Sequence, residues 1–415
     1  MQGIDCLVRN KATEGNRLYN KAFENMDNFT EGEWIMSRLK VMSIFGTRPE
    51  AIKMAPLVLE LQKRPEQFES IVTVTAQHRE MLDQVLQIFG IEPDYDLNIM
   101  KQKQTLAQIT TRALEGLDEV MKEVKPDIVL VHGDTTTTFA ASLAAFYNEI
   151  PVGHVEAGLR TWNKYSPFPE EINRQATGII ADLHFSPTIK SKQNLLNENK
   201  SEDTIFVTGN TAIDALQTTV SDDYSHEVLE KIGDRRLVLM TAHRRENLGE
   251  NMDAMFRAIR RIADKHEDVE IVYPVHLNPL VQEAAKKWLG EHDRIHLIEP
   301  LEVIDFHNFV ANAHLILTDS GGIQEEAPSL GVPVLVLRDT TERPEGIEAG
   351  TLRLVGTDED VIFDAAHLLL SVESEHQKMA QASNPYGDGQ ASRRIADAIL
   401  YYFKKSNDRP DEFKS

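Results

Sequence analysis

Cysteine is almost absent from the sequence, which has one residue of this type, Cys6, among 415. One cysteine cannot form an internal disulfide, and this fits a reducing compartment. The chain also lacks a run of roughly 18 apolar residues, the length that a membrane-spanning helix needs. The start of the chain has no apolar core of the kind found in signal peptides. These absences predict a cytoplasmic protein without a transmembrane helix.

Positive charge is scarce as well. The chain has 44 Lys and Arg residues against 66 Asp and Glu residues, and its formal net charge is −22. Such a chain repels nucleic acid and anionic membrane surfaces, so we expect neither as a partner. It also repels an anionic small substrate. A phosphate site in this protein must therefore be locally basic or be built from helix N-termini.

The sequence signatures of common cofactor sites are missing too. There is no His-Glu-x-x-His pair and no cysteine cluster, so we expect no metal site. No Gly-x-Gly-x-x-Gly follows any apolar run, so a dinucleotide cofactor is not indicated. The sequence therefore predicts chemistry carried out without a cofactor.

Residues 1–35 differ from the rest of the chain. They are polar and rich in Asn, and they show no clear hydrophobic periodicity, whereas an apolar run begins soon after Met36. We expect this segment to be a disordered or non-native extension, with Met36 as the natural start. The alternative is a genuine regulatory arm.

From residue 39 onward, short apolar runs alternate with helical patterns. The predicted strands are 39–45, 70–76, 127–133, 151–157, 182–187 and 204–209 in a first series, and 237–242, 269–275, 294–300, 314–320, 332–337 and 352–356 in a second. Helical patterns between them include 50–64, 105–124 and 136–148. Continuous apolar strands that alternate with helices predict parallel sheets covered by helices on both faces.

The acidic stretch 221–236 separates the two series, and the chain is long enough for two domains. We therefore predict an α/β protein with two doubly wound Rossmann-like domains, 36–207 and 208–385, that face each other across a cleft. Residues 386–415 are expected to form a helix that crosses back to the first domain, followed by a tail. Open α/β sheets bind ligands beyond the carboxyl ends of their strands, so the loops after the strands are the candidate site.

The first of these loops has features of a phosphate site. Gly46 permits a tight turn where the strand ends, and Pro49 suits the first turn of a helix. Arg48 and Lys53 then lie near the helix N-terminus, a combination suited to phosphate. The alternative is an ordinary strand–helix turn with charged residues on its surface.

Three carboxylates, Asp134, Glu156 and Glu170, fall at the same edge of the first predicted sheet. Each has a structural alternative: Asp134 could cap the next helix, and Glu170 could be favoured by a helix N-terminus. Glu156 ends an apolar strand, an awkward place for a carboxylate unless it is functional or paired, for example with Arg160. Clustered carboxylates raise one another's pKa and divide naturally into an acid and a base. The set therefore predicts proton transfer.

The second predicted sheet ends in basic and polar loops. His243 and two arginines follow its first strand and suggest an anion site, although the arginines could instead pair with nearby acids. His276 and Asn278 follow the next strand and are able to bind a ligand.

Further along, Ser320, Gly321 and Gly322 leave backbone N–H groups open at a strand–helix junction. A helix dipole there favours a diphosphate. Glu326 could accept hydrogen bonds from ribose hydroxyls, and Arg343 lies near the same edge.

Eight motifs occur in order: GTRPEAIKMAP, HGDTTTT, HVEAGLRT, FPEEINR, TAHRREN, PVHLNP, TDSGGIQEEAP and DTTERPE. In this order and spacing, from about residue 40 to about residue 395, the chain resembles the non-hydrolysing UDP-N-acetylglucosamine 2-epimerases of bacteria. The resemblance implies a GT-B fold, a homodimer, and interconversion of UDP-N-acetylglucosamine and UDP-N-acetylmannosamine without a cofactor. UDP leaves C1, which acidifies the C2 hydrogen; 2-acetamidoglucal forms, and UDP re-adds. The product would supply cell-surface polymers such as teichoic acid linkage units, capsules or enterobacterial-type antigens.

The resemblance also assigns roles by position. Asp134, Glu156 and Glu170 match acid–base carboxylates, and His243 matches a histidine near the diphosphate. The residues that match substrate-contacting positions are Arg48, Lys53, Ser320, Gly321, Gly322, Glu326 and Arg343, with Phe306 beside uracil.

Many bacterial members use a second UDP-N-acetylglucosamine molecule as an allosteric activator. Gln77 and His243 match that site, but Glu80 stands where glutamine is expected and Lys103 where arginine is expected. The first change adds negative charge, and the second loses a bidentate donor. Weak, absent and normal activation all stay open.

Three other functions compete with this one. A GT-B glycosyltransferase would need an acceptor pocket but not three acids at one sheet edge. A hydrolysing epimerase would release free N-acetylmannosamine and UDP, and such enzymes often carry a fused kinase domain. A sugar-nucleotide sensor without turnover would not need the carboxylates.

Overall fold

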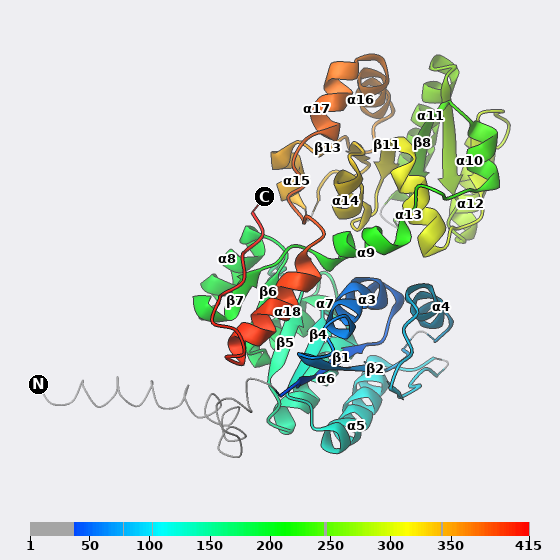
Figure 1. The fold of residues 1–415 in the computed structure, drawn as a ribbon. Helices are drawn as coiled ribbons and strands as arrows, with labels where there is room; N and C mark the ends of the chain where they lie inside the picture. The colour runs from blue at the N-terminus through cyan, green and yellow to red at the C-terminus, as the bar shows by residue number, and fades with distance from the viewer. Residues whose placement is uncertain (1–36, 78, 102, 245–246, 342, 415) are drawn as a thin grey trace, which may run out of the picture. The chain divides into compact units, whose positions relative to one another are not determined.

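The computed structural model describes residues 37–414 except 78, 102, 245, 246 and 342, so the expected extension 1–35 lies outside the described residues. The chain divides into two compact units. Unit 1 comprises the described residues up to Thr211 together with Gln390–Phe413, and unit 2 comprises Ala212–Gly389 and Lys414 (Figure 1).

The described part of unit 1 contains a seven-stranded sheet with the order β3-β2-β1-β4-β5-β6-β7. All of its neighbouring strands run parallel. The strands are β1 (Leu39–Phe45), β2 (Phe68–Val74), β3 (Tyr95–Asp96), β4 (Ile128–His132), β5 (Val152–Val155), β6 (Leu183–Ser186) and β7 (Ile205–Val207). The edge strand β3 was not predicted, because two residues are too short to give a hydrophobic pattern.

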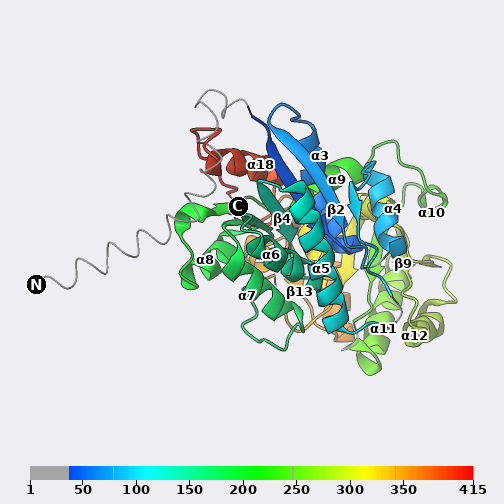
Figure 2. The same cartoon turned by 90° about the horizontal axis from the view of Figure 1, so that it is seen from below.

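The helices of unit 1 fill the connections between these strands. They are α3 (Arg48–Gln62), α4 (Arg79–Phe89), α5 (Leu106–Val124), α6 (Thr136–Tyr147), α7 (Glu170–Ile180), α8 (Ile189–Asn197) and, from the C-terminal segment, α18 (Ala391–Tyr402), with a short 3₁₀ turn, η2 (Glu202–Thr204). Helices α5, α6 and α7 pack in succession, and Figure 2 shows them in a row. Helix α18 lies beside α3 (Figure 1), so the chain returns to unit 1 at its end.

The described part of unit 2 contains a six-stranded parallel sheet with the order β10-β9-β8-β11-β12-β13. The strands are β8 (Arg236–Thr241), β9 (Val269–Pro274), β10 (Ile295–Ile298), β11 (Ala313–Thr318), β12 (Val334–Val336) and β13 (Leu352–Leu354). The helices are α9 (Thr211–Thr219), α10 (Glu227–Ile232), α11 (Glu250–Lys265), α12 (Pro279–Leu289), α13 (Val303–Ala311), α14 (Ile323–Glu326), the 3₁₀ turn η4 (Ala327–Leu330), α15 (Pro344–Ala349), α16 (Glu359–Ser371) and α17 (Glu373–Ala380).

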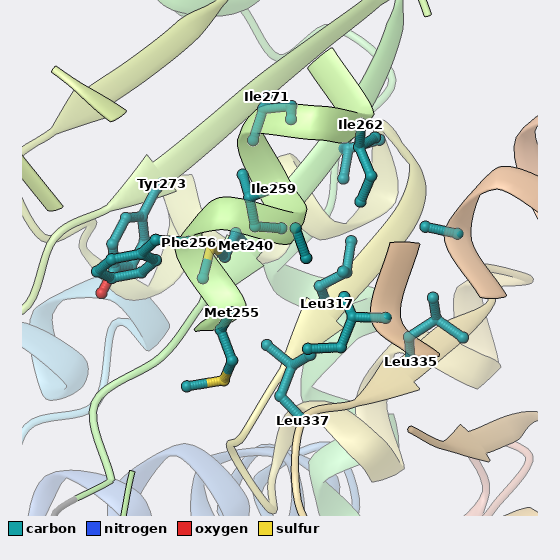
Figure 3. Packing of buried hydrophobic residues seen from close by; sticks show 14 of the residues in the cluster. Met240, Met255, Phe256, Ile259, Ile262, Ile271, Tyr273, Leu317, Leu335 and Leu337 are labelled. Atoms are coloured by element: carbon teal, nitrogen blue, oxygen red, sulfur yellow. The ribbon is translucent and has the colours of Figure 1, made fainter. Parts of the chain in front are cut away.

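Apolar residues from helices and strands form the core on each sheet face. In unit 2, Phe256 and Ile259 of α11 pack against strand residues such as Ile271, Tyr273 and Leu317 (Figure 3). The opposite face of this sheet has its own cluster, which includes side chains from α13. Burial of both sheet faces explains why the strands read as continuous apolar runs. The prediction of two doubly wound Rossmann-like domains is confirmed.

Each sheet has one point at which the strand order reverses. In unit 1 the connections move outward in opposite directions from β1 and β4, and in unit 2 from β8 and β11. The loops that follow these four strands therefore flank the crevice where open α/β sheets bind ligands. None of the described helices is both long and apolar enough to span a membrane.

Candidate active site

Glu50 lies at the reversal point of unit 1, with only 2% of its surface exposed. One carboxylate oxygen accepts hydrogen bonds from the N–H groups of Gly46 and Thr47, at 3.1 and 2.9 Å, and from the Thr47 hydroxyl at 2.8 Å. The other oxygen accepts a hydrogen bond from the Thr135 hydroxyl at 2.7 Å. Glu50 therefore joins the loop after β1 to the loop after β4.

The loop after β1 was predicted to be part of a phosphate site with Arg48 and Lys53, and this stays a prediction. The N–H groups of Gly46 and Thr47 donate to Glu50, so these two amides are used within the protein. The ammonium group of Lys53 forms an ion pair with the Glu156 carboxylate. The helix begins at Arg48, two residues before the predicted start.

Glu156, directly after β5, is at the centre of the acid cluster. One oxygen pairs with Lys53 and lies 3.4 Å from the side-chain amide of Asn210. The other lies 3.8 Å from Nε2 of His132. The alternative pairing with Arg160 is wrong, because that guanidinium binds both oxygens of Glu198 at 2.6 and 2.8 Å.

The backbone of Glu156 adopts a left-handed conformation with φ of 62°. A residue with a side chain pays about 1 kcal/mol for this conformation, and such residues cluster at functional sites. In this position the side chain of Glu156 reaches the loop after β4, where a Cβ added to Gly133 would lie 3.3 Å from Oε2. The strained backbone thus brings the carboxylate of one strand end beside the next.

Asp134 follows β4, but it does not cap α6. The cap is Thr135, whose side chain accepts a hydrogen bond from the N–H of Thr138. The Asp134 carboxylate pairs instead with Arg174 of α7 at 2.5 Å. Burial raises the pKa of Asp134 to about 6, opposed by the positive charge of Arg174 and assisted by two neighbouring carboxylates. This group can therefore hold a proton close to neutral pH.

Glu170 and Glu171 open helix α7, and the structure separates their roles. Glu171 is fully buried, and its carboxylate accepts hydrogen bonds from the N–H groups of Thr161 and Trp162, both at 3.0 Å. Glu170 is the partly exposed member, and its negative charge is among those that raise the pKa of Asp134. Asp134, Glu156 and Glu170 are therefore brought together as predicted from the strand ends.

Three histidines lie buried on neighbouring strands beside this cluster. Burial lowers the pKa of His132 to about 4, and those of His154 and His184 to about 3, so all three are neutral at pH 7. His154 and His184 are register partners on β5 and β6. These residues give Glu156 an uncharged surrounding on the sheet side. His132 and His154 lie in the quoted motifs and His184 in a predicted strand, but no residue pattern indicated that the three would be adjacent.

Asp319 holds the corresponding position in unit 2. It is fully buried after β11 and accepts hydrogen bonds from the N–H groups of His243 and Arg244, at 3.0 and 2.9 Å. The side-chain amide of Asn247 donates to it at 3.1 Å. Asp319 thereby joins the loop after β11 to the loop after β8. Asp319 lies within the motif TDSGGIQEEAP, but no residue pattern indicated this role.

His243 and His276 form a stacked pair whose ring centroids lie 5.5 Å apart at an interplanar angle of 12°. The His243 side chain is 42% exposed, so it is open to a ligand. Asn278 has a structural task, because its side-chain oxygen caps α12 by accepting a hydrogen bond from the N–H of Leu280 at 3.0 Å. If Asn278 contacts a ligand as predicted, its side-chain NH₂ group is the part that can donate a hydrogen bond to it.

The Ser320-Gly321-Gly322 loop lies at a strand–helix junction, between β11 and α14. Helix α14 has four residues and continues directly into the 3₁₀ turn η4. The N–H of Ser320 donates to the Thr318 hydroxyl at 2.9 Å. A Cβ on Gly321 would lie 2.6 Å from the guanidinium of Arg343, so glycine allows that cation to cover the loop.

Two further predicted residues lie nearby in unit 2. Arg343 donates from Nε to the buried Glu325 at 2.7 Å. Glu326 lies one residue further along α14, with its carboxylate 3.7 Å from Nε2 of His307. Phe306 of α13 is half-buried against the core cluster on that sheet face. Carboxylates, histidine and arginine thus gather beside the glycine loop.

The residues matched to the activator site lie near the carboxyl edge of unit 1. The Gln77 side-chain oxygen accepts a hydrogen bond from the Thr137 hydroxyl at 3.4 Å. Glu80 is exposed in the first turn of α4, and Lys103 is exposed with a left-handed backbone. Within the described residues, no group of three or more His, Cys, Asp or Glu side chains is placed to hold a metal ion.

Comparisons with known proteins agree on one family. The family model described as UDP-N-acetylglucosamine 2-epimerase matches residues 59–400. UDP-N-acetylglucosamine 2-epimerase of Bacillus subtilis strain 168 is 70% identical over 378 residues, which cover 91% of this chain and 99% of that protein. A crystal structure of UDP-N-acetylglucosamine 2-epimerase is 68% identical with a TM-score of 0.87, and covers 92% of this chain and 100% of its own. The enzyme from Neisseria meningitidis, bound to UDP-GlcNAc, is 51% identical with a TM-score of 0.78, and covers 87% and 100%.

Proposed function

Because the chain belongs to the UDP-N-acetylglucosamine 2-epimerase family, we propose that it is of the non-hydrolysing type and interconverts UDP-N-acetylglucosamine and UDP-N-acetylmannosamine. The observation that carries this proposal is the carboxylate cluster of unit 1. Asp134, Glu156 and Glu170 gather at one sheet edge, with Lys53 paired to Glu156. An enzyme that only transferred or bound a sugar nucleotide would not need this set.

The reaction requires a proton to leave C2 and another to return to its opposite face. The C2 hydrogen is not next to a carbonyl, so direct removal is very hard. Cleavage of the C1–O bond sends the electron pair to UDP, and the developing positive charge at C1 makes the C2 hydrogen acidic. Loss of that proton gives 2-acetamidoglucal. Protonation of C2 from the other face and attack of a UDP oxygen on C1 complete the epimerisation.

The two carboxylates of unit 1 with defined partners suit different steps. Glu156 is paired with Lys53, which favours its ionised form, so we assign it the removal of the C2 proton in one direction. Asp134 has a pKa raised to about 6 by burial, which suits a group that delivers a proton near neutral pH. The pair thus follows the general pattern in which environment separates an acid from a base.

Unit 2 is the proposed binding region for UDP. Support comes from Arg343 above Gly321, from the exposed ring of His243, and from Ser320 and Gly322 in the same loop. The Neisseria relative with bound UDP-GlcNAc makes the same ligand class reasonable for this chain. We assign Arg343 and His243 to the diphosphate, whose negative charge grows as the C1–O bond breaks.

Four finer expectations belong to the same proposal. The protein is cytoplasmic, it forms a homodimer, and its product supplies N-acetylmannosamine for a cell-surface polysaccharide. A second UDP-N-acetylglucosamine binds near Gln77, Glu80 and Lys103 as an activator. An initial rate that rises more steeply than a hyperbola with UDP-N-acetylglucosamine concentration would support the activator, and a simple hyperbola would oppose it.

Proton NMR in D₂O tests the central proposal. The enzyme is incubated with UDP-N-acetylglucosamine, and both C2 epimers are followed. We expect UDP-N-acetylmannosamine with deuterium at C2. Free N-acetylmannosamine would show the hydrolysing reaction instead, and turnover only after an acceptor is added would show glycosyl transfer. An epimerised product that keeps its original C2 hydrogen would exclude elimination.

A further inference from the structure

The Glu50 carboxylate accepts hydrogen bonds from several donors of the protein. It lies between the N-termini of α3 and α6, where the helix dipoles favour a negative charge. The N–H groups of Gly46 and Thr47 and the hydroxyls of Thr47 and Thr135 all donate to it. Burial raises the pKa of Glu50, whereas these hydrogen bonds lower it. The group occupies the crevice that a bound anion fills in many related sheets.

Space around this carboxylate is closed. A Cβ on Gly46 would lie 2.0 Å from the hydroxyl of Thr75, so only glycine fits at that point of the loop. The Thr138 hydroxyl lies 3.2 Å from Glu50 but 2.5 Å from the carbonyl oxygen of His132, to which it donates. The loop after β1 and the start of α6 are therefore packed around one side chain.

The two threonines that Glu50 holds each have a proposed functional residue beside them. Thr47 is followed by Arg48, a predicted substrate contact, and Thr135 is preceded by Asp134, the proposed proton donor. A movement of either threonine would carry its neighbour with it. Displacement of a reacting group by about 1 Å is enough to slow catalysis about 100-fold.

We propose that Glu50 is a positioning residue of the reaction, which sets the spacing between Arg48 and Asp134 by holding the threonine next to each. This inference rests on the proposed epimerase function. It assigns Glu50 no contact with the substrate. The task depends on the length and the hydrogen-bonding atoms of the side chain, and its negative charge is secondary.

Two conservative variants separate length from charge. Glu50→Gln keeps the length, since its amide oxygen can accept from Gly46 and Thr47 while its amide group donates to the Thr135 hydroxyl oxygen. Glu50→Asp keeps the charge but is one methylene shorter, so it cannot reach both loops. We expect Glu50→Gln to retain kcat within about threefold of wild type, and Glu50→Asp to lose about 100-fold.

A matched control is available in unit 2. Glu270 is also a buried carboxylate, paired with Arg235 at 2.5 Å and with His296 at 2.7 Å, and it has no place in the proposed site. Glu270→Asp should lower the melting temperature but leave kcat within about twofold. A purely structural role for Glu50 predicts the same result for Glu50→Asp.

The assay is the exchange of the C2 hydrogen in D₂O, with kcat and KM measured at several pH values. A positioning role predicts that Glu50→Asp lowers kcat more than it raises KM, with the pH dependence unchanged. The proposal is overturned if Glu50→Asp is as active as wild type, or if Glu50→Gln is the more damaged of the two. Wild-type protein that shows no epimerisation would instead refute the proposed function, so the two failures are distinguishable.

Discussion

The points of strand reversal in the two units are built alike but carry opposite chemistry. In each, a buried carboxylate accepts N–H groups from the loop after one central strand and connects it to the loop after the other: Glu50 in unit 1 and Asp319 in unit 2. The difference lies in what stands next to each carboxylate. Beside Glu50 lie further acids and neutral histidines, and beside Asp319 lie the exposed His243 and Arg244.

The comparison shows that the topology fixes where the loops lie. The side chains next to the buried carboxylate then determine which chemistry each loop can carry out. The same reversal point can present proton carriers or anion ligands, because in both cases the carboxylate accepts backbone N–H groups from the loop after the first central strand. Charge at each edge then comes from side chains. In unit 1 a lysine pairs with Glu156, and in unit 2 Arg343 covers a glycine.

The strongest test of this division is Glu156→Gln. The amide keeps the shape of the side chain but cannot take a proton, so we expect kcat to fall about 1,000-fold with little change in KM. The measurement is deuterium incorporation at C2, with Glu198→Gln as the control because Glu198 pairs with Arg160 and is not one of the proposed acid–base carboxylates. A Glu156→Gln protein within tenfold of wild type would show that Glu156 is not the base.

A smaller effect of a different kind is expected from Gly321→Ala in unit 2. The new methyl would displace the guanidinium of Arg343, so KM should rise about tenfold. The value of kcat should fall as well, because the charge on the diphosphate grows as the C1–O bond breaks. The measurement is a double-mutant cycle with Arg343→Ala. The double variant should match Arg343→Ala alone. Additive effects would show that the methyl acts by another route, and a loss confined to kcat would contradict a binding role for this edge.

The smallest effect concerns the acid stability of unit 1. A buried histidine that stays neutral contributes stability above its unfolded pKa of about 6.5, and this stability is lost as pH falls toward its folded pKa. Burial lowers the pKa of His184 to about 3, so the loss begins below pH 6.5 and grows toward that value. We therefore expect wild type to lose about 1 kcal/mol more free energy of unfolding than His184→Leu when the pH is lowered from 7.5 to 5.5.

Urea unfolding midpoints at the two pH values measure this difference. His292→Gln is the control, because His292 lies in unit 2 beside the exposed carboxylate of Asp264. A gain for His184→Leu that does not depend on pH would show improved packing and no titration effect.

Much of the architecture could be predicted from the sequence because buried parallel strands give continuous apolar runs. Twelve of the thirteen strands in the described chain coincide with predicted runs, and the thirteenth, β3, has two residues. The grouping of Asp134, Glu156 and Glu170 also followed from strand ends alone. Loops at the carboxyl edge of one sheet lie together whatever their distance along the chain.

The side-chain pairs within the site were harder to predict from the sequence. Lys53 reaches Glu156 across 103 residues, and the pairing depends on the left-handed backbone of Glu156, which no residue pattern reveals. Arg160, close in sequence, was the natural guess and is engaged elsewhere. Glu50 did leave a signal, because Thr47 followed by a glutamate three residues later is the pattern of a helix capping box. Reading that pattern would have shown that the amides of this loop were already bound.

The return of α18 to unit 1 has a consequence for how the chain is made. Residues Ala212–Gly389 of unit 2 form one continuous segment, whereas unit 1 needs Gln390–Phe413, in which Arg394 is buried and donates to the carbonyl of Thr208 at 3.2 Å. During synthesis, this segment of unit 2 is therefore made before the N-terminal unit has its last helix. The usual N-to-C order of domain completion is reversed, because unit 1 reaches its final form only after Gln390–Phe413 has been made.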